Sequence, residues 1–108
     1  MTDIYQIPIE TNDASFKIRT KLGNTDYVLK IYWNERYERW HISIHDANEL
    51  SILVGIPLNI DTNILARFRN PVLPAGIFML YDTAEKHEEA GRDDLYNQKA
   101  VLLYQENS

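Results

Sequence analysis

The alternation of apolar and polar residues is the strongest signal in the first half of the chain. Over residues 16–22, apolar side chains alternate with lysines and an arginine, and residues 27–33 and 40–45 repeat the alternation. This period is typical of strands that bury one face, and an apolar run over 50–54 predicts a further strand. The turns between these strands are too short for crossover helices, so we expect an antiparallel meander.

The second half of the chain is less regular. Residues 4–9 and 100–104 predict a short first strand and an apolar last strand. Residues 76–81 are apolar on both faces, which favours a strand that runs through the core. Residues 61–63 could cap one short helix within 62–68, where a loop fits equally well.

Together these elements predict an all-β fold. About six to seven short strands, with turns every eight to twelve residues or so, indicate a small antiparallel barrel or sandwich with at most one short helix. The chain of 108 residues fits a single β domain over 1–108 with one modest core. The strand order in the second half is ambiguous, so both the barrel and the sandwich stay open.

Composition removes several kinds of chemistry. There are no cysteines, which excludes disulfides, a thiolate nucleophile and a thiolate zinc site. The apolar runs are far shorter than the roughly 20 residues that span a bilayer. Residues 1–5 do not begin a readable signal peptide, so we expect a protein made and kept in a cytosol, without a membrane partner.

The net charge of −5 comes mainly from one stretch of the chain. Residues 82–94 contain six acids and two bases, whereas the remainder has ten acids and nine bases. We expect residues 82–98 to form a mobile loop, or one that is ordered by a partner. A net acidic chain repels polyphosphate at long range, which argues against a dedicated nucleic-acid binder.

No pattern singles out a catalytic, metal or cofactor site. His41 and His45 would lie about 13 Å apart on one strand face, too far to share a zinc ion with ligand bonds of about 2.1 Å. We interpret both as surface histidines. The acids of 82–94 lack the spacing of a calcium loop, and the serines and glycines lack the context of a nucleophile elbow or a phosphate loop. We therefore predict a protein that is not an enzyme and has no cofactor.

Single-stranded nucleic-acid binding by a small β barrel is the main alternative. Such barrels combine aromatic residues on a sheet face with a basic groove. The residues that could share such a face here are Lys17, Arg19, Lys21, Lys30, Tyr32 and His41. A half-buried sheet needs a polar outer face in any case, and the negative net charge favours that simpler interpretation.

Three aromatic residues surround the turn at 34–38. By alternation, Trp33 and Trp40 share the apolar faces of their strands, so we expect them to belong mostly to the core. Tyr37 is expected at the exposed tip of the turn. An exposed tyrosine is a candidate contact for a protein partner.

The order of several short motifs resembles a known family. Residues 31–48 contain a strand ending in Trp-Asn, a charged turn, a second Trp that opens a strand and an Asp-Ala-Asn turn. Gly-Ile-Pro-Leu follows at 55–58, Gly-Arg-Asp-Asp-Leu at 91–95 and Val-Leu-Leu-Tyr at 101–104. With Ile-Pro-Ile at 7–9, this order is similar to the phage baseplate plug family of contractile-tailed bacteriophages.

The resemblance implies a structural protein of a bacteriophage or prophage tail baseplate, which plugs or braces the central hub and is assembled in the host cytoplasm. Its partners would be hub and spike proteins, with the tape measure protein as a further candidate. Asp93, Asp94 and Leu95 then join Tyr37 as candidate partner-binding residues, with the acids facing basic hub residues. One departure is Glu49, where the family pattern has Gly; this could change the turn type.

Overall fold

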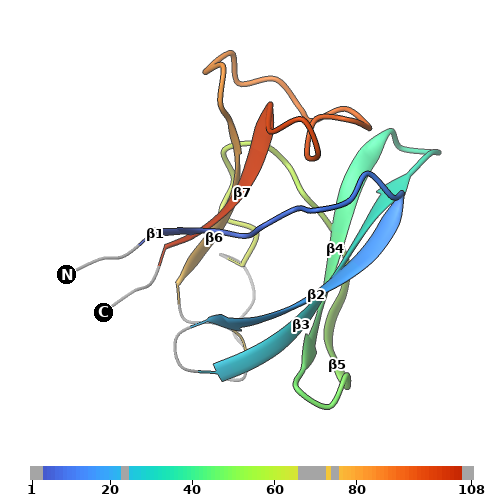
Figure 1. The fold of residues 1–108 in the computed structure, drawn as a ribbon, viewed down its shortest axis with the longest axis vertical. Helices are drawn as coiled ribbons and strands as arrows, with labels where there is room; N and C mark the ends of the chain where they lie inside the picture. The colour runs from blue at the N-terminus through green and yellow to red at the C-terminus, as the bar shows by residue number, and fades with distance from the viewer. Residues whose placement is uncertain (1–3, 23–24, 66–72, 74–75, 106–108) are drawn as a thin grey trace.

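The computed structural model describes residues 4–22, 25–65, 73 and 76–105. In this part of the chain, seven strands form two antiparallel sheets that pack as a sandwich (Figure 1). The strands are β1 (Ile4–Gln6), β2 (Ser15–Leu22), β3 (Thr25–Asn34), β4 (Arg39–Asp46), β5 (Ser51–Pro57), β6 (Ile77–Asp82) and β7 (Ala100–Gln105). The described residues form no helix, and therefore none long and apolar enough to cross a membrane. The all-β prediction is confirmed, and the structure decides for a sandwich-like arrangement over a closed barrel.

The four-stranded sheet has the order β2-β3-β4-β5, so the predicted meander is confirmed. Its register aligns apolar side chains in rows across the strands. Ile31 lies opposite Phe16 on one side and Ile42 on the other, and Ile42 in turn pairs with Ile56. Ile31 and Ile42 are completely buried. A slip of one residue would turn such a row toward solvent, so burial of this face fixes the register.

The three-stranded sheet has the order β1-β7-β6. It therefore contains both the first and the last strand of the described chain. Phe78 and Tyr104 meet edge to face in the core, with ring centroids 5.9 Å apart. Gly76 sits so close to β7 that a Cβ there would lie 2.1 Å from the carbonyl oxygen of Gln105. Only glycine fits without movement of the backbone.

The expectation that residues 76–81 form a strand that runs through the core is confirmed, since Phe78 and Leu80 are completely buried members of the core cluster. β6 lies at one side of its sheet and not in the middle. It is apolar on both faces because Phe78 and Leu80 face the core while Ile77 and Met79 lie on the opposite face. Ile60 covers part of its free edge through a parallel bridge to Leu80.

The connection after β5 crosses from one sheet to the other. The N–H of Leu58 donates to the carbonyl oxygen of Trp40 at 2.8 Å, and the N–H of Asp61 donates to that of Leu80 at 2.9 Å. After β5, the chain thus changes from hydrogen bonding with β4 to hydrogen bonding with β6 within a few residues. Residues 61–65 form turns and not a helix, and the rest of the predicted helix within 62–68 lies outside the described residues.

In the turn between β4 and β5, the residue after Asp-Ala-Asn has a backbone conformation that favours glycine. Glu49 has a φ of 63°, in the left-handed region. The side chain of Asp46 stabilises the turn by accepting hydrogen bonds from the N–H groups of Asn48 and Leu50, both at 2.9 Å. Glu49 also pairs with Lys17 at 2.8 Å. The departure from glycine therefore adds an exposed ion pair and does not remove the left-handed residue.

The interpretation of His41 and His45 as surface histidines is wrong. They are only 9% and 6% exposed, on the face of β4 that points away from the main core. The ring of Tyr32 stacks on that of His41, with centroids 5.6 Å apart, and the hydroxyl of Ser51 lies 3.4 Å from Nδ1 of His45. The alternation of apolar and polar residues shows which face of the strand a side chain lies on. It does not show that side chains of β3 and β5, on either side of β4, cover the outer face of β4.

Truncation of the central row should test how strongly it stabilises the sandwich. We expect Ile42→Ala to lower the free energy of unfolding by about 2–5 kcal/mol, because it leaves a cavity in the core beside Ile31 of β3 and Ile56 of β5. Urea denaturation followed by circular dichroism measures this loss. The control Leu50→Ala, at a position that is 65% exposed, should change stability by no more than about 0.5 kcal/mol. Equal effects of the two variants would contradict this description of the core.

Candidate functional site

Two connections meet at one end of the sandwich. The β3–β4 turn (residues 35–38) and the β6–β7 connection (residues 83–99) both lie at the top of Figure 1. The indole Nε1 of Trp40, at the start of β4, donates to the carbonyl oxygen of Gly91 at 2.9 Å, so the two connections are tied together. We call the surface that they form the apical surface.

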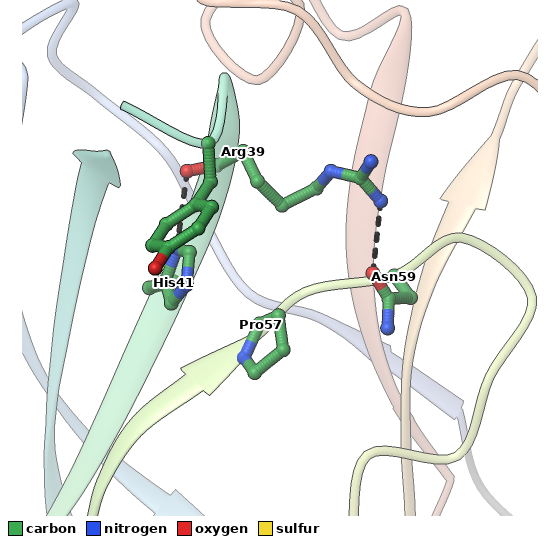
Figure 2. A pocket seen from close by; sticks show the side chains of 5 residues that line it. Arg39, His41, Pro57 and Asn59 are labelled. Carbon is green, nitrogen blue, oxygen red and sulfur yellow. Dashed lines mark hydrogen bonds between the residues drawn. The ribbon is translucent and has the colours of Figure 1, made fainter. Parts of the chain in front are cut away.

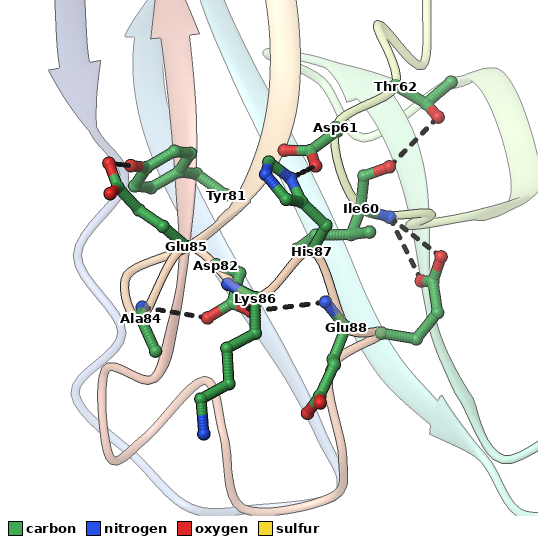
Figure 3. Close-up of polar contacts among 11 residues, drawn as sticks. Ile60, Asp61, Thr62, Tyr81, Asp82, Ala84, Glu85, Lys86, His87 and Glu88 are labelled. Carbon is green, nitrogen blue, oxygen red and sulfur yellow. Dashed lines mark hydrogen bonds and ion pairs between the residues drawn. The ribbon is translucent and has the colours of Figure 1, made fainter.

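Asp82 organises the first half of the β6–β7 connection (Figure 3). Its carboxylate accepts hydrogen bonds from the N–H groups of Ala84, Lys86 and Glu88 at 2.9, 3.1 and 3.2 Å. The N–H of Ala84, followed by that of Glu88, holds the pKa of Asp82 below its ordinary value. A carboxylate that satisfies several backbone donors at once folds a polar chain into a defined turn.

Apolar residues fix the second half of the connection. Leu95 and Ala90 are 1% and 4% exposed and belong to the core cluster. The Arg92 guanidinium lies 5.5 Å from the centroid of the Trp40 ring and donates to the carbonyl oxygen of Asn12 at 2.7 Å. The structure therefore differs from the expected mobile or partner-ordered loop, because buried anchors and an internal carboxylate order this segment without a partner.

Several charged groups of the apical surface are engaged within the chain. Arg39 pairs with Glu89 at 2.9 Å, and the same carboxylate accepts the N–H of Ile60 at 3.0 Å. His87 of the β6–β7 connection pairs with Asp61, which lies in the connection between β5 and β6 (Figure 3). Asp61 raises the pKa of His87, through the hydrogen bond first and then through its charge.

The four predicted partner-binding residues fall into two groups. Tyr37 is 65% exposed at the tip of its turn, and Asp93 is exposed, although it accepts a hydrogen bond of 3.3 Å from Asn12. Asp94 accepts the N–H of Gly91 at 2.7 Å, and Leu95 is buried. Tyr37 and Asp93 are therefore open to direct contact, whereas Asp94 and Leu95 shape the segment that carries Asp93.

A pocket of about 370 Å³ opens beside Tyr37, and sequence reasoning missed it. Figure 2 shows it between the start of β4 and the chain that leaves β5. Its lining residues are Tyr37, Arg39, His41, Pro57 and Asn59. Arg39 closes one side by donating from Nη1 to Oδ1 of Asn59 at 2.9 Å. These residues are distant in sequence and carry no shared motif, so only the pairing of β4 with β5 reveals the pocket.

A second pocket of about 280 Å³ lies under the β6–β7 connection. Its lining includes the acids Asp82, Glu88, Glu89 and Asp94 and the bases Lys86 and Lys99. Within the described ranges, no three or more histidines or acids are grouped closely enough to hold a metal ion. The acids here serve backbone donors, as the bonds of Asp82 and Asp94 show.

The basic outer face considered for nucleic acid does form on the four-stranded sheet, where Lys17 pairs in register with Lys30. Four of its members contact their own chain, however. Lys17 binds Glu49, and Arg19 donates to the carbonyl oxygen of Ala47 at 2.9 Å. The aromatic residues of the set, Tyr32 and His41, stack on each other. This arrangement is that of a polar outer sheet face with internal partners.

The fold and the apical surface define a small two-sheet β domain whose charged residues mainly stabilise its own turns. A family model described as cyanophage baseplate Pam3 plug gp18 matches residues 4–107. The chain therefore belongs to this family of phage baseplate plug proteins, and the resemblance seen in the motifs is confirmed. It is a structural component of a tail baseplate. No curated protein matches the chain.

Replacing Asp82 should loosen the β6–β7 connection. Asp82→Asn keeps the shape but leaves one oxygen acceptor for three N–H groups, so we expect a lower Tm at pH 7. The lowered pKa of Asp82 means that its carboxylate stabilises the fold fully above its ordinary value of 3.8 and loses this effect as the pH falls through the folded value. The difference in Tm between the two proteins should therefore shrink in acid. A difference that is absent at pH 7, or constant with pH, would contradict the assignment.

The pairing of His87 with Asp61 should appear in a titration. We expect NMR of the His87 ring to give a pKa above its ordinary value of 6.5, and Asp61→Asn to bring the pKa back toward that value. Because the folded pKa is raised, the ion pair stabilises the connection below pH 6.5 and loses its effect as the pH rises through the folded value. The same pKa in both proteins would show that the pair does not form in solution.

Proposed function

We propose that this protein sits at the centre of a phage or prophage tail baseplate, where it plugs or braces the hub through protein–protein contacts. Membership of the baseplate plug family carries this proposal. The partners would be hub and spike proteins, with the tape measure protein as a further candidate, and assembly would take place in the host cytoplasm. In this role the chain catalyses no reaction and needs no cofactor.

The apical surface is the part of the domain best suited to bind the hub. It exposes two large aromatic side chains, with Tyr37 at 65% and Tyr96 at 49% exposure. Tyrosine is enriched among the residues that dominate the energy of protein interfaces. Both rings stand on connections that internal contacts hold in place, so little order would have to be gained on binding.

The charge of the apical surface favours a basic partner. Its exposed acids are Glu35, Glu38, Glu85, Glu88, Glu89 and Asp93, and its exposed bases are Arg36, Lys86 and Lys99. Complementary charge across an interface speeds association and suppresses wrong partners. We propose that Asp93 faces basic residues of the hub, while Asp94 and Leu95 hold it in position.

Variants at the two exposed candidates test this role. We expect Tyr37→Ala combined with Asp93→Asn to lower the amount of the protein in purified tails by about tenfold or more, because an interface tyrosine and a paired charge are lost. The measurement is a complementation assay, in which a phage lacking the gene receives the variant and its tails are purified and quantified. The Tm of the isolated variant should be unchanged, since both side chains are exposed.

Asp26→Asn is the matched control, because this exposed acid lies at the far end of β3 from the turn that carries Tyr37. The control protein should enter tails in normal amounts. Normal incorporation of the double variant would refute a hub contact at the apical surface. Loss of incorporation together with a lower Tm would refute it as well, because it would assign the defect to folding.

A further inference from the structure

The two edges of the four-stranded sheet are protected unequally. The outer strand β2 carries Lys17, Arg19 and Lys21 on one face, and charged side chains on an edge discourage pairing with another chain. The opposite outer strand, β5, contains no charged residue over Ser51–Pro57. Its Val54 side chain is 65% exposed. The sheet thus has one edge guarded by charge, at β2, and one edge without charge, at β5, which we call the open edge.

The backbone of β5 indicates what could cover the open edge. β5 pairs with β4 on one side, and within the described residues no strand pairs with its other side. An edge strand presents N–H and C=O groups in a row, and an extended segment of another chain matches such a row. The occupant indicated by this edge is therefore a strand and not a globular apolar surface.

The length of any added strand is limited by irregular pairing. The register between β4 and β5 shifts on both sides of Ile44. Gly55 has a φ of 71°, and its N–H points back to Oγ of Ser43 at 3.0 Å. Pro57 then ends the row, because it has no N–H to donate. A few ladder hydrogen bonds alone would bind weakly, so a second contact is needed.

The pocket of Figure 2 can supply that contact, since it lies between the start of β4 and the end of β5. Pro57, the last residue of β5, lines the pocket, and so does Asn59, two residues further along the chain. The rings of Tyr37, His41 and Pro57 line the pocket together with the polar side chains of Arg39 and Asn59. The pocket lies on the β4 side of Pro57, so a proline or aromatic side chain from a strand on the free side of β5 would enter it by reaching over Pro57.

Resting on the proposed baseplate function, we propose that β5 and this pocket bind an extended segment of a neighbouring baseplate protein. The segment adds a short strand to the open edge at Val54 and inserts one ring-bearing side chain beside Tyr37. This contact is separate from the acidic contact proposed for Asp93. The plug would therefore be held through two surfaces, one by charge and one by main-chain pairing.

Photocrosslinking in assembled tails tests the edge contact. The photoreactive residue p-benzoylphenylalanine is placed at Val54 or, as the matched control, at Ser15, an exposed residue on the guarded edge. After irradiation of purified tails, we expect the Val54 position to form a covalent adduct with another baseplate protein, mapped by mass spectrometry to one extended segment. The Ser15 position should give at least about tenfold less adduct, since pairing at β2 is disfavoured.

Charge at the open edge gives the second measurement. Val54→Lys should lower the amount of the protein in tails by about tenfold or more, whereas Ser15→Lys, with the same added charge, should have no effect. An adduct between two copies of this chain, an adduct from Ser15 alone, or normal incorporation of Val54→Lys would overturn the inference. If the unmodified protein is absent from tails, the proposed baseplate role itself fails.

Discussion

The burial of Trp40 is the interaction on which the rest of the structure depends. Its ring is 2% exposed and packs edge to face against Trp33 and Phe16, with ring centroids 5.6 and 6.1 Å away. A buried indole N–H without an acceptor would cost about 1–3 kcal/mol. The carbonyl oxygen of Gly91 satisfies it, and this bond, together with the ion pair of Arg39 with Glu89, ties the β6–β7 connection to the four-stranded sheet.

This constraint explains how a strongly charged segment becomes part of a rigid domain. Asp82 folds the first half of the connection around its carboxylate, and Leu95 places the second half in the core. The charges that remain outside, such as Asp93, are therefore presented by a fixed backbone. A fixed presentation suits a component that fits one place in an assembly, because little conformational entropy is lost when a preformed surface binds.

The sequence predicted most of the sheets and little of the surface. Alternation placed Phe16, Ile31 and Ile42 on one buried face because a period of two leaves few alternatives when one side is apolar. It missed the anchoring of the β6–β7 connection, where Asp82 bonds only to nearby backbone groups and leaves no periodic trace. The pocket beside Tyr37 was also out of reach, since it forms only when β4 and β5 pair.

The central claim is that this protein is a fixed part of the finished baseplate. Quantitative mass spectrometry of purified tails from the phage or prophage that encodes it tests this claim most directly. The account predicts a few copies per particle, found together with the hub and spike proteins. Absence from finished tails, with the protein present in the lysate, would contradict the account and leave an assembly factor as the better description.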